Sequence, residues 1–539
     1  MKTRYILFST LLIFVTNLVF SQVPGITSSN LPLVVINTNG QAILDASKIT
    51  AKMKVINNGA GNVNRPTDPG NNFDGNVGIE YRGGNSKSNE QNPYNFETRD
   101  ASGANLNVSL LGMPEENDWI LLSNYDDKTF IRNSLAFQLF RKGSHYAPRT
   151  QMVEVIVNNE YQGIYLLAEK IKQDKGRVDI SKLTSADVSG DNLTGGYIFK
   201  IDSWDVTNSW QSNFAPFDYP DKAVHYVYDD PSATDLVTAQ KDYLKTTVNS
   251  FETVLHSTGF ANTTTGYPAW LKLNSFMDYF IVSEVSRNVN AYKKNCYYFK
   301  NKNSKDSKIH SGPVWDFDSA FKNIVGCEPY AATDGSGWSY KINVCTTNKT
   351  NSNDWIVRLL QDPAFATAVS TRYFEMRKTY LSTQYLNTFI DSIQNKAMEA
   401  QVRHYTKWPI LGSSVGTPEV DAQPDTYVGQ VAKFKDWIQT RLTWLDGHMV
   451  GGPNSVPVLE TDFSYRIFPN PTHDLLYLES SYEIQGVEIF TSQGTCVMMK
   501  DGLSTYSTQL NVSTYSHGIY FVQLKTKGNQ IIHSKLVVD

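Results

Sequence analysis

Two aspartates near the middle of the chain, Asp316 and Asp318, have the type and spacing of a small cation-binding pair. They follow the apolar residues 313–315, which predict a short strand. Side chains alternate faces along a strand, so both carboxylates would project to one side and Phe317 into the core. Carboxylate oxygens are the hard ligands that Mg²⁺ prefers. The alternative is a pair of aspartates that only caps a turn.

Two asparagines upstream extend this pattern. Asn290 and Asn295 are five residues apart, and a strand-like run at residues 296–299 follows directly. This order, with an Asp before Phe after the strand, resembles a protein-kinase catalytic centre, which normally has Asp in the first position. Phosphoryl transfer is therefore one chemistry that these residues predict, with Asn290 and Asp316 as the catalytic candidates.

A glycosidase is another chemistry that two carboxylates suggest, and their spacing disfavours it. Glycosidases hold two carboxyl groups on opposite sides of the bond that they cleave. Asp316 and Asp318 lie two residues apart on one predicted strand, so they would face the same way.

Length and composition limit the class of protein. A chain of 539 residues is too long for one ordinary core and predicts two or three folded units. A content of 40% hydrophobic and 19% charged residues is typical of a globular protein. The 49 basic and 53 acidic residues nearly balance, which disfavours a nucleic-acid-binding or polybasic membrane-surface protein.

Residues 1–21 have the features of a secretory signal peptide. A short basic region precedes an apolar run at residues 6–20, and Val19 and Ser21 are small enough for the cleavage positions. We therefore expect the mature chain to begin near Gln22. A retained membrane anchor is the alternative, but the run is short for a transmembrane helix and no later stretch is long enough for one.

The four cysteines predict one disulfide bond. They show no zinc-type spacing. In an oxidising compartment Cys327 and Cys345 are the natural pair, because they bracket a single loop that contains Gly and Ser. Such a bridge stabilises a fold by about 3 kcal/mol in the chain-entropy model. We expect Cys296 and Cys496 to be unpaired and buried.

Up to about residue 232 the chain predicts mainly strands. One helix is expected over residues 130–140, capped by Asp126 or Asp127. The segment from Arg82 to Ser86 contains two glycines, which either let the backbone approach a phosphate or form an ordinary hairpin turn. Strands separated by Asn- and Gly-rich turns are expected at residues 31–36, 52–56, 77–81, 153–157, 164–168 and 195–202.

Helices dominate the prediction after residue 232. Apolar residues at helical spacing predict helices at 236–255, 270–285, 363–376, 386–393 and 431–445. A β-rich part followed by a helical part, with the acids at their junction, predicts an α+β fold with two lobes.

The C-terminal residues predict a separate small unit. Residues 451–458 have the Gly- and Pro-rich composition of a linker. Short strands joined by tight turns predict an all-β sandwich over residues 459–539. The expected strands are residues 475–479, 487–490, 495–499, 507–512, 519–525 and 531–538.

Residues 31–449 resemble the spore-coat-protein-H (CotH) family of atypical secreted protein kinases, so we assign residues 22–450 to a CotH-like domain. The matching runs occur in the order that the family has them. They are residues 110–114 with Trp119, 127–129 with Arg132 and Asn133, 146–150, 159–165 with 169–171, 194–202 and 312–321.

The resemblance implies an atypical two-lobed protein-kinase-like domain. Its members transfer the γ-phosphoryl group of ATP to Ser or Thr hydroxyls of proteins, with Mg²⁺ or Mn²⁺ as the metal. On that template Asp316 would hold the metal across the phosphates and Asn295 would hold a second metal position. Asp318 would act as an auxiliary ligand or an orienting group.

The chain departs from the family pattern at two places. The position that usually holds Asp is Asn290, and an amide can orient a hydroxyl but cannot take its proton. A basic pair before the strand at residue 94 is replaced by Gln91 and Asn92. Other cations would then have to contact phosphate, with an acid as ion-pair partner. The candidates are Lys87, Lys200 and Arg82, with Glu169 as the partner.

These departures leave two functions open. One is an exported, metal-dependent protein kinase that acts on surface or co-secreted proteins. The other is a secreted pseudokinase or cell-surface binding protein without turnover.

The tail resembles a type IX secretion sorting domain. The matching runs are residues 468–472, 518–520 and 535–538. The resemblance implies recognition by the type IX secretion machinery and export through the periplasm, to the medium or to the cell surface.

Overall fold

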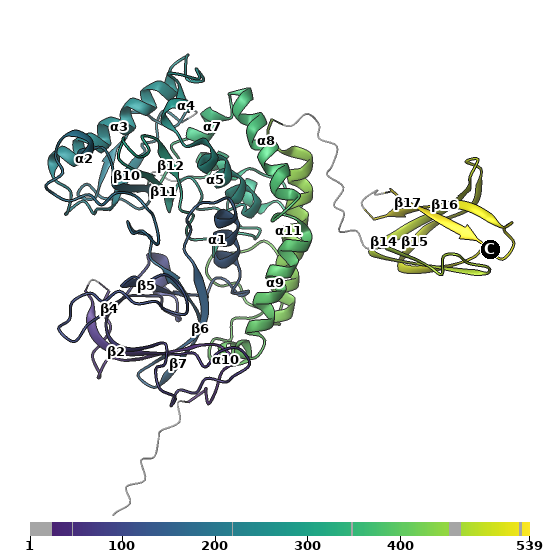
Figure 1. Cartoon of the computed structure of the whole chain (residues 1–539), viewed down its shortest axis with the longest axis horizontal. Coiled ribbons are helices and arrows are strands. Elements are labelled where there is room, and N and C mark those ends of the chain that lie inside the picture. Colours follow the sequence, from purple (N-terminus) through teal and green to yellow (C-terminus); the bar gives the residue numbers. More distant parts are fainter. Residues whose placement is uncertain (1–23, 46, 218, 347–348, 452–464, 528–530) are drawn as a thin grey trace, which may run out of the picture. The chain divides into compact units, whose positions relative to one another are not determined.

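The computed structural model describes residues 24–45, 47–217, 219–346, 349–451, 465–527 and 531–539. The chain forms two compact units that divide within the predicted linker (Figure 1). The predicted signal peptide and most of the predicted linker lie outside the described residues. The larger unit mixes helices and strands, and the C-terminal unit is all-β.

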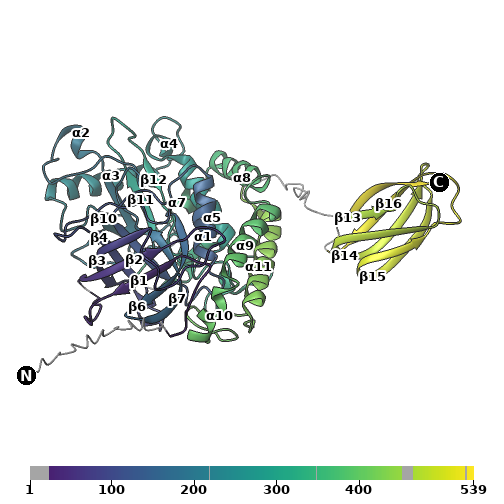
Figure 2. The ribbon, with the colours of Figure 1, turned by 60° about the horizontal axis from the view of Figure 1, so that its bottom comes forward.

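Seven strands of the larger unit close into a barrel (Figure 2). The order around the barrel is β1-β2-β3-β4-β5-β7-β6, and a parallel pairing of β1 with β6 closes it. Along β2, Ala51, Met53 and Val55 are buried, so the alternation of a strand fills the barrel interior. The strands are β1 (Leu33–Asn37), β2 (Ile49–Ile56), β3 (Phe73–Tyr81), β4 (Tyr94–Arg99), β5 (Asp118–Ser123), β6 (Thr150–Val157) and β7 (Glu160–Glu169).

The first long helix, α1 (Arg132–Lys142), begins where Asp127 binds its first turn. The Asp127 carboxylate accepts hydrogen bonds from the backbone N–H groups of Thr129, at 3.0 Å, and Arg132, at 2.8 Å. Asp127 thus binds the N–H of the first helical residue from a position five residues before it. The N-cap itself is Ile131, which makes no capping hydrogen bond, so the prediction that Asp126 or Asp127 caps the helix is wrong.

A second sheet has five antiparallel strands in the order β12-β11-β8-β10-β9. Three of its strands precede residue 232 and two follow it. The predicted change from a β-rich to a helical part near residue 232 therefore does not coincide with the edge of a sheet. The strands are β8 (Tyr197–Ile201), β9 (Ser209–Gln211), β10 (His225–Asp230), β11 (Cys296–Lys300) and β12 (Ile309–Ser311).

Helices cover the second sheet and one flank of the larger unit. In Figures 1 and 2, α9 and α11 run side by side along this flank. No helix in the described part of the chain is long and apolar enough to cross a membrane. The longer helices are α3 (Thr238–His256), α5 (Leu273–Ser286), α8 (Pro363–Arg377), α9 (Thr383–Ala397), α10 (Ala400–Lys407) and α11 (Tyr427–His448). The short ones are η1 (Asn85–Ser88), α2 (Gly190–Leu193), α4 (Tyr267–Trp270), α6 (Glu328–Ala331), η2 (Ser339–Val344) and α7 (Trp355–Leu359).

Helix α10 packs directly on the barrel strand β7. Gly163 of β7 has φ +97°, and a Cβ at this position would lie 2.7 Å from Nδ1 of His404 and 3.0 Å from Nε1 of Trp408. The His404 Nδ1 accepts the backbone N–H of Ile164 at 3.0 Å. Only glycine allows both this backbone conformation and this close approach of the helix.

The disulfide bond between Cys327 and Cys345 is confirmed. Cys296 is free and buried, as predicted. Cys496 is free but exposed, so its predicted burial is wrong. It begins β15, whose side chains are mostly exposed and which pairs only with β14 among the described strands.

The described residues of the C-terminal unit form five strands in one connected sheet. Four of the six predicted short strands are joined in pairs, within β14 and within β15. Register shifts between residues 479 and 484 let β14 continue through residues that lie between two of the predicted strands. Alternate residues such as Leu476, Leu478, Val487 and Ile489 form its core. The strands are β13 (Tyr465–Phe468), β14 (Leu475–Thr491), β15 (Cys496–Asn511), β16 (Gly518–Thr526) and β17 (Ile531–Val538).

Candidate functional site

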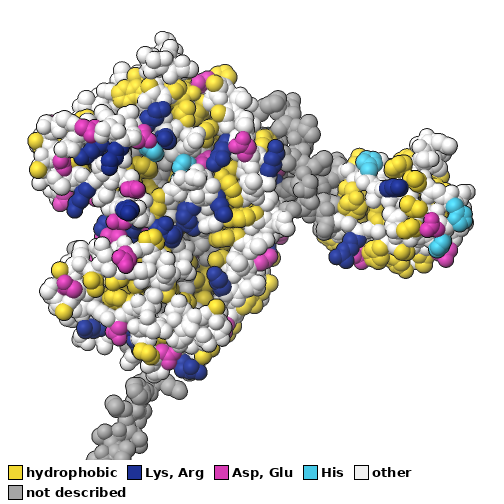
Figure 3. All heavy atoms as spheres, in the orientation of Figure 1, with side chains coloured by type: hydrophobic (Ala, Val, Ile, Leu, Met, Phe, Trp, Pro, Cys, Tyr) yellow, Lys and Arg dark blue, Asp and Glu magenta, His cyan; other side chains and the backbone are white. Residues whose placement is uncertain are grey.

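A cavity of about 1160 Å³ opens between the barrel and the second sheet. In Figure 3 acidic and basic side chains gather in the recess between these two parts. Its walls come from segments far apart in the sequence. They include the β3–β4 connection, the residues after β5, strands β8 and β10, residues 289–297, residues 315–319 and residues 416–418.

Asp316 lies in the wall of this cavity and binds both predicted asparagines. Its Oδ2 accepts hydrogen bonds from Nδ2 of Asn295, at 2.5 Å, and Nδ2 of Asn290, at 3.4 Å. Nδ2 of Asn288 donates to the Asp316 backbone carbonyl at 3.2 Å. The structure therefore brings together Asn290, Asn295 and Asp316, which are up to 26 residues apart in sequence.

The backbone that carries the acids is not a strand. Strand β12 ends at Ser311, Gly312 has φ +103° and Asp316 has φ +67°, so the pleat of a strand is broken here. The strand predicted at residues 313–315, which was expected to end in the two acids, is therefore wrong. Asp316 and Asp318 both line the cavity nevertheless, and Phe317 is buried as predicted.

Asp318 carries an acidic group next to other acids. Its pKa lies well above the ordinary value because the carboxyl is buried and because the carboxylates of Asp316 and Asp126 are close. Like charges held together in this way favour a bound cation. In the part of the chain that is described, no group of three or more His, Cys, Asp and Glu is arranged to hold a metal ion. The predicted metal site thus consists of two carboxylates and the Asn295 amide.

Asp126 lines the cavity and was missed as a site residue in the sequence. Its Oδ1 accepts from Nζ of Lys322, at 2.7 Å, and from the Thr417 N–H, at 3.1 Å. Its Oδ2 accepts from the hydroxyls of Ser319, at 2.9 Å, and Thr417, at 3.0 Å. Asp126 thereby ties the acid-bearing segment to residues 416–418. The sequence offered one signal for this role. Two adjacent acids precede the helix, and only one acid is needed at a helix start, so the other was available for the site.

Arg82 is a cation of the cavity wall that forms no ion pair with any residue that the structure describes. Its guanidinium lies 5.6 Å from the centre of the Trp315 ring. Burial lowers its pKa, although Asp316 and Asp318 oppose this effect. The structure gives the guanidinium no hydrogen bond and no salt bridge to any described residue. The glycines that follow, Gly83 and Gly84, also line the cavity.

Lys200 lies in the same cavity but is already paired. Its Nζ lies 2.9 Å from Oδ1 of Asp229 and 3.2 Å from Oδ2 of Asp202, and it donates to the Tyr297 hydroxyl at 3.2 Å. Burial alone would lower its pKa, but Asp229, Tyr297 and Asp202 together hold the pKa well above the ordinary value.

Two other predicted cofactor contacts lie elsewhere. Glu169 accepts from Nε of Arg149 at 3.0 Å and from Nη2 at 2.7 Å, so the predicted pairing of Glu169 with a lysine is wrong. Lys87 pairs with Asp45 at 2.6 Å. Neither Glu169 nor Lys87 is among the residues that line the cavity.

Gln91 is a buried structural residue and does not line the cavity. Its amide donates to the carbonyl of Ile164 at 2.9 Å and to that of Gln162 at 3.2 Å. Its Oε1 accepts the Asn124 N–H at 3.0 Å. An amide carries both donors and an acceptor, which is why Gln fits this position. In this structure the position does not supply a phosphate contact.

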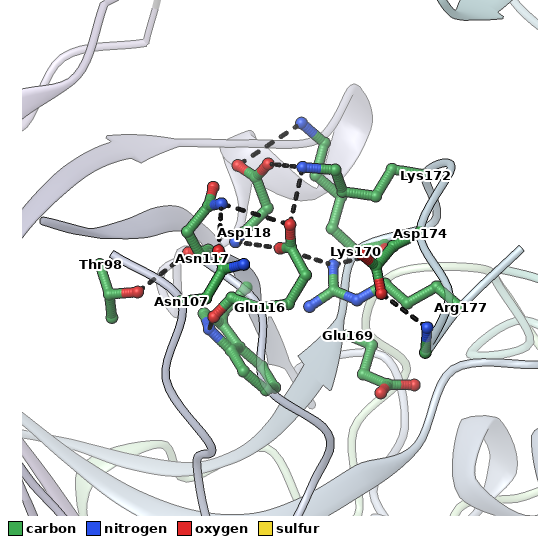
Figure 4. A network of polar contacts seen from close by, with 12 residues as sticks. Thr98, Asn107, Glu116, Asn117, Asp118, Glu169, Lys170, Lys172, Asp174 and Arg177 are labelled. Atoms are coloured by element: carbon green, nitrogen blue, oxygen red, sulfur yellow. Dashed lines mark hydrogen bonds and ion pairs between the residues drawn. The ribbon is translucent and has the colours of Figure 1, made fainter. Parts of the chain in front are cut away.

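A network of charged side chains lies at the start of β5 and after the end of β7 (Figure 4). We call Glu116, Asp118, Lys170, Lys172 and Arg177 the barrel charge network. Lys172 donates to Glu116 at 2.9 Å and to Asp118 at 2.7 Å, and Arg177 lies 3.4 Å from Glu116.

This network fixes the segment that follows β7. Within that segment the backbone N–H of Gln173 donates to Oδ2 of Asp230 at 2.5 Å. Asp230 follows Asp229, the ion-pair partner of Lys200. The network therefore connects the barrel to the end of β10 and to one wall of the cavity.

The C-terminal residues 466–539 match the family model described as a secretion system C-terminal sorting domain. The tail is thus a type IX sorting domain, and the protein is secreted or displayed at the cell surface. The secretion machinery is its implied partner. No curated protein matches the chain.

Residues 79–445 match the family model described as CotH kinase protein. The matched range contains Arg82, Lys200, Asn290, Asn295, Asp316 and Asp318. Since the match spans more than half of the 539 residues, the chain belongs to the CotH kinase protein family.

Proposed function

We propose that this exported CotH family member is an atypical protein kinase whose turnover is limited by Asn290. It binds ATP with Mg²⁺ or Mn²⁺ in the cavity and transfers the γ-phosphoryl group to Ser or Thr hydroxyls. Its substrates are surface or co-secreted proteins, because the sorting domain directs the chain to that location.

The distribution of paired and unpaired charges in the cavity carries this proposal. Lys200 is neutralised by Asp202 and Asp229, and Asp126 by Lys322. Asp316 and Asp318 have no cation bonded to them among the described residues, and Arg82 has no bonded acid. A polyphosphate bound together with a divalent cation would supply the missing ionic partners. The cation would bind Asp316 and Asp318, and the phosphate would bind Arg82.

The residues present fit such a metal. Asp316 and Asp318 provide hard oxygen ligands. Asn295, whose amide nitrogen donates to Asp316, would hold a second metal position through its side-chain oxygen. When bound, the metal neutralises phosphate charge, which is most of what phosphoryl transfer requires of a catalyst. The remaining work is positioning, and Asn288 and Asn295 fix Asp316 from both its backbone and its side chain.

Asn290 occupies the position of the proton acceptor. In the transfer, the acceptor hydroxyl oxygen bonds to the γ-phosphorus while the bond from that phosphorus to the bridging oxygen of ADP breaks. The Asn290 amide can accept a hydrogen bond from the hydroxyl and orient it, but it cannot take the proton. The proton must then leave to water or to a phosphoryl oxygen, so we expect slow turnover.

The proposal includes the two-lobed kinase-like architecture. The barrel with the loop at residues 82–84 supplies one wall of the cavity, and the second sheet with the loop at residues 289–297 supplies the other. In this arrangement the nucleotide lies where the barrel, which has its own interior core, faces the second sheet.

A radiolabelled-ATP transfer assay on a Ser/Thr-rich acceptor protein tests the proposal. We expect weak transfer by the wild type and an increase of about 10²–10⁴-fold in Asn290→Asp, the usual contribution of a general base. Asp316→Asn should abolish transfer. Asp242→Asn, the same chemical change on an exposed residue of α3, is the control.

A secreted pseudokinase is the second candidate function, and Asn290 is the observation that favours it. Binding of ATP with Mg²⁺, without transfer by either the wild type or Asn290→Asp, would support it. Robust wild-type transfer that Asn290→Asp does not raise would show that Asn290 is not the proton-acceptor position. Absence of ATP binding would contradict both functions.

A further inference from the structure

Lys294 lines the cavity beside Asn295, and nothing in the sequence pattern singled it out. In the described part of the chain its ammonium forms no hydrogen bond and no salt bridge. It shares this property with Arg82. The other cation of the cavity wall, Lys200, is held by two carboxylates.

A hydrogen-bonded turn at residues 290–294 places Lys294 in the cavity wall. The Lys294 N–H donates to the carbonyl of Asn290 at 2.9 Å. Tyr292, inside this turn, has φ +67°, so the turn is not helical. Lys294 lines the cavity together with Asn290 and Asn295, whereas Lys293 does not line it.

The loop that carries Lys294 is held rigidly at both ends. Before it, the Arg287 guanidinium donates to the carbonyls of Ala332, at 3.0 Å, and Ser336, at 2.7 Å. Within it, the Tyr292 hydroxyl donates to the buried Glu284 at 3.1 Å. After it, β11 enters the second sheet directly. A long, unpaired cation on a fixed backbone is prepared for an anion and loses little freedom when it binds one.

The charges of the whole wall agree with a second anion contact. The acids that line the cavity are Asp126, Asp202, Asp229, Asp316 and Asp318, and the cations are Arg82, Lys200 and Lys294. After the ion pairs described above are set aside, two acids and two cations remain. One cation therefore stays unexplained when Arg82 alone contacts phosphate.

We propose that Lys294 is a second phosphate-binding residue, which together with Arg82 binds the polyphosphate chain of a metal-bound nucleoside triphosphate. This inference rests on the proposed nucleotide site and adds a residue to it. Both residues contact only the polyphosphate part of the ligand, so an inorganic polyphosphate with the metal should bind in the same way. Lys294 acts on the phosphates, and the acids act on the metal.

Titration calorimetry with four probes tests this assignment on the full mature chain. The probes are Mg²⁺ alone, Mg²⁺ with inorganic tripolyphosphate, Mg²⁺ with ATP, and adenosine. Lys294→Met should weaken both polyphosphate probes about tenfold or more, as expected for a lost charge-assisted hydrogen bond. It should leave adenosine affinity unchanged and should not weaken Mg²⁺ alone. Lys294→Arg keeps the charge and should bind polyphosphate within a few-fold of the wild type.

Lys293→Met is the matched control, since it removes the neighbouring lysine that does not line the cavity. Polyphosphate binding by Lys294→Met equal to that of the wild type would overturn the assignment and leave the proposed function standing. Equal weakening of all four probes would also overturn it, because the lysine would then be structural. A wild type that binds neither polyphosphate probe would remove the nucleotide site itself, and this inference with it.

Discussion

The barrel charge network and the cavity are both rich in charged side chains, but they differ in how far acids and cations contact one another. In the network the acids Glu116 and Asp118 each contact at least one cation, and Lys172 touches both. In the cavity Asp316 and Asp318 sit beside each other, and Arg82 has no bonded acid among the described residues. A matched cluster stabilises the fold, whereas an unmatched one costs stability and is prepared for a ligand.

This difference is sharper because the two clusters are connected. The network holds the segment before β8, and through Asp230 it holds the end of β10 that carries Asp229. The matched charges thus help to fix the wall that carries Asp229 and Lys200, in the same cavity that the unmatched charges line. The same chain uses ionic contacts for rigidity in one place and for binding in another.

The largest expected change in stability comes from breaking an ion pair of the barrel charge network. Glu116→Ala leaves Arg177 and Lys172 without their shared carboxylate, and Arg177 is almost fully buried. Breaking a buried ion pair on one side should lower the free energy of unfolding by about 3 kcal/mol. Thermal and urea unfolding would measure it. The neighbouring exposed residue gives the control, and Glu115→Ala should stay within about 0.5 kcal/mol of the wild type.

A slightly smaller loss of stability is expected when the buried Gln91 amide is replaced by a lysine. Gln91→Lys removes three hydrogen bonds of a fully buried side chain and leaves an ammonium without an acid. We expect a loss of about 2–3 kcal/mol in unfolding free energy and no gain in ATP affinity. Asn92→Lys, at a half-buried neighbour, should be tolerated. Tighter ATP binding by Gln91→Lys would show that this position faces phosphate after all.

His404 is buried outside the cavity, and the Nε2 atom of its ring has no hydrogen-bond partner among the described residues. Its contribution to stability should depend on pH. Burial lowers its pKa to about 3, while the unfolded chain keeps the ordinary value of 6.5. The unfolded state therefore binds the proton first, and stability present above pH 6.5 is lost as the pH falls. By pH 5 the loss should be about 1–2 kcal/mol.

Comparison with His404→Asn isolates this loss, because the Asn side-chain oxygen can still accept the Ile164 N–H that Nδ1 accepts now. The variant should show a flatter dependence of unfolding free energy on pH between 7 and 5. Parallel profiles for the two proteins would contradict the assignment to His404.

The smallest expected change in stability comes from the unmatched acids themselves. Asp316→Asn removes one of two neighbouring carboxylates, so the unfolding free energy of the free protein should change by less than about 0.5 kcal/mol. The increase in melting temperature caused by ATP with Mg²⁺ or Mn²⁺ should nevertheless disappear, since this shift follows ligand affinity by mass action. An unchanged shift in the variant would remove Asp316 from the metal site.

The sequence alone predicts much of the candidate site. The spacing of Asn290 and Asn295 and the acids at 316 and 318 are local features, and the structure places all four on one cavity. The same holds for the disulfide bond between Cys327 and Cys345, which closes a short loop of known composition. Phe317 was also predicted correctly as buried, although the strand expected around it does not form.

Tertiary structure alone decided which charges are matched. Lys200 meets Asp229 across two strands of the second sheet, Glu169 meets Arg149, and Asp126 meets Thr417 at a separation of 291 residues. Periodicity and spacing describe neighbours in the chain, whereas an ion pair depends on which distant segments the fold brings within about 4 Å. The spacing of residue types therefore indicated the proposed phosphoryl-transfer site, and only the packing of the barrel against the second sheet left Arg82 and Lys294 as cations of the cavity wall without an ion pair among the described residues.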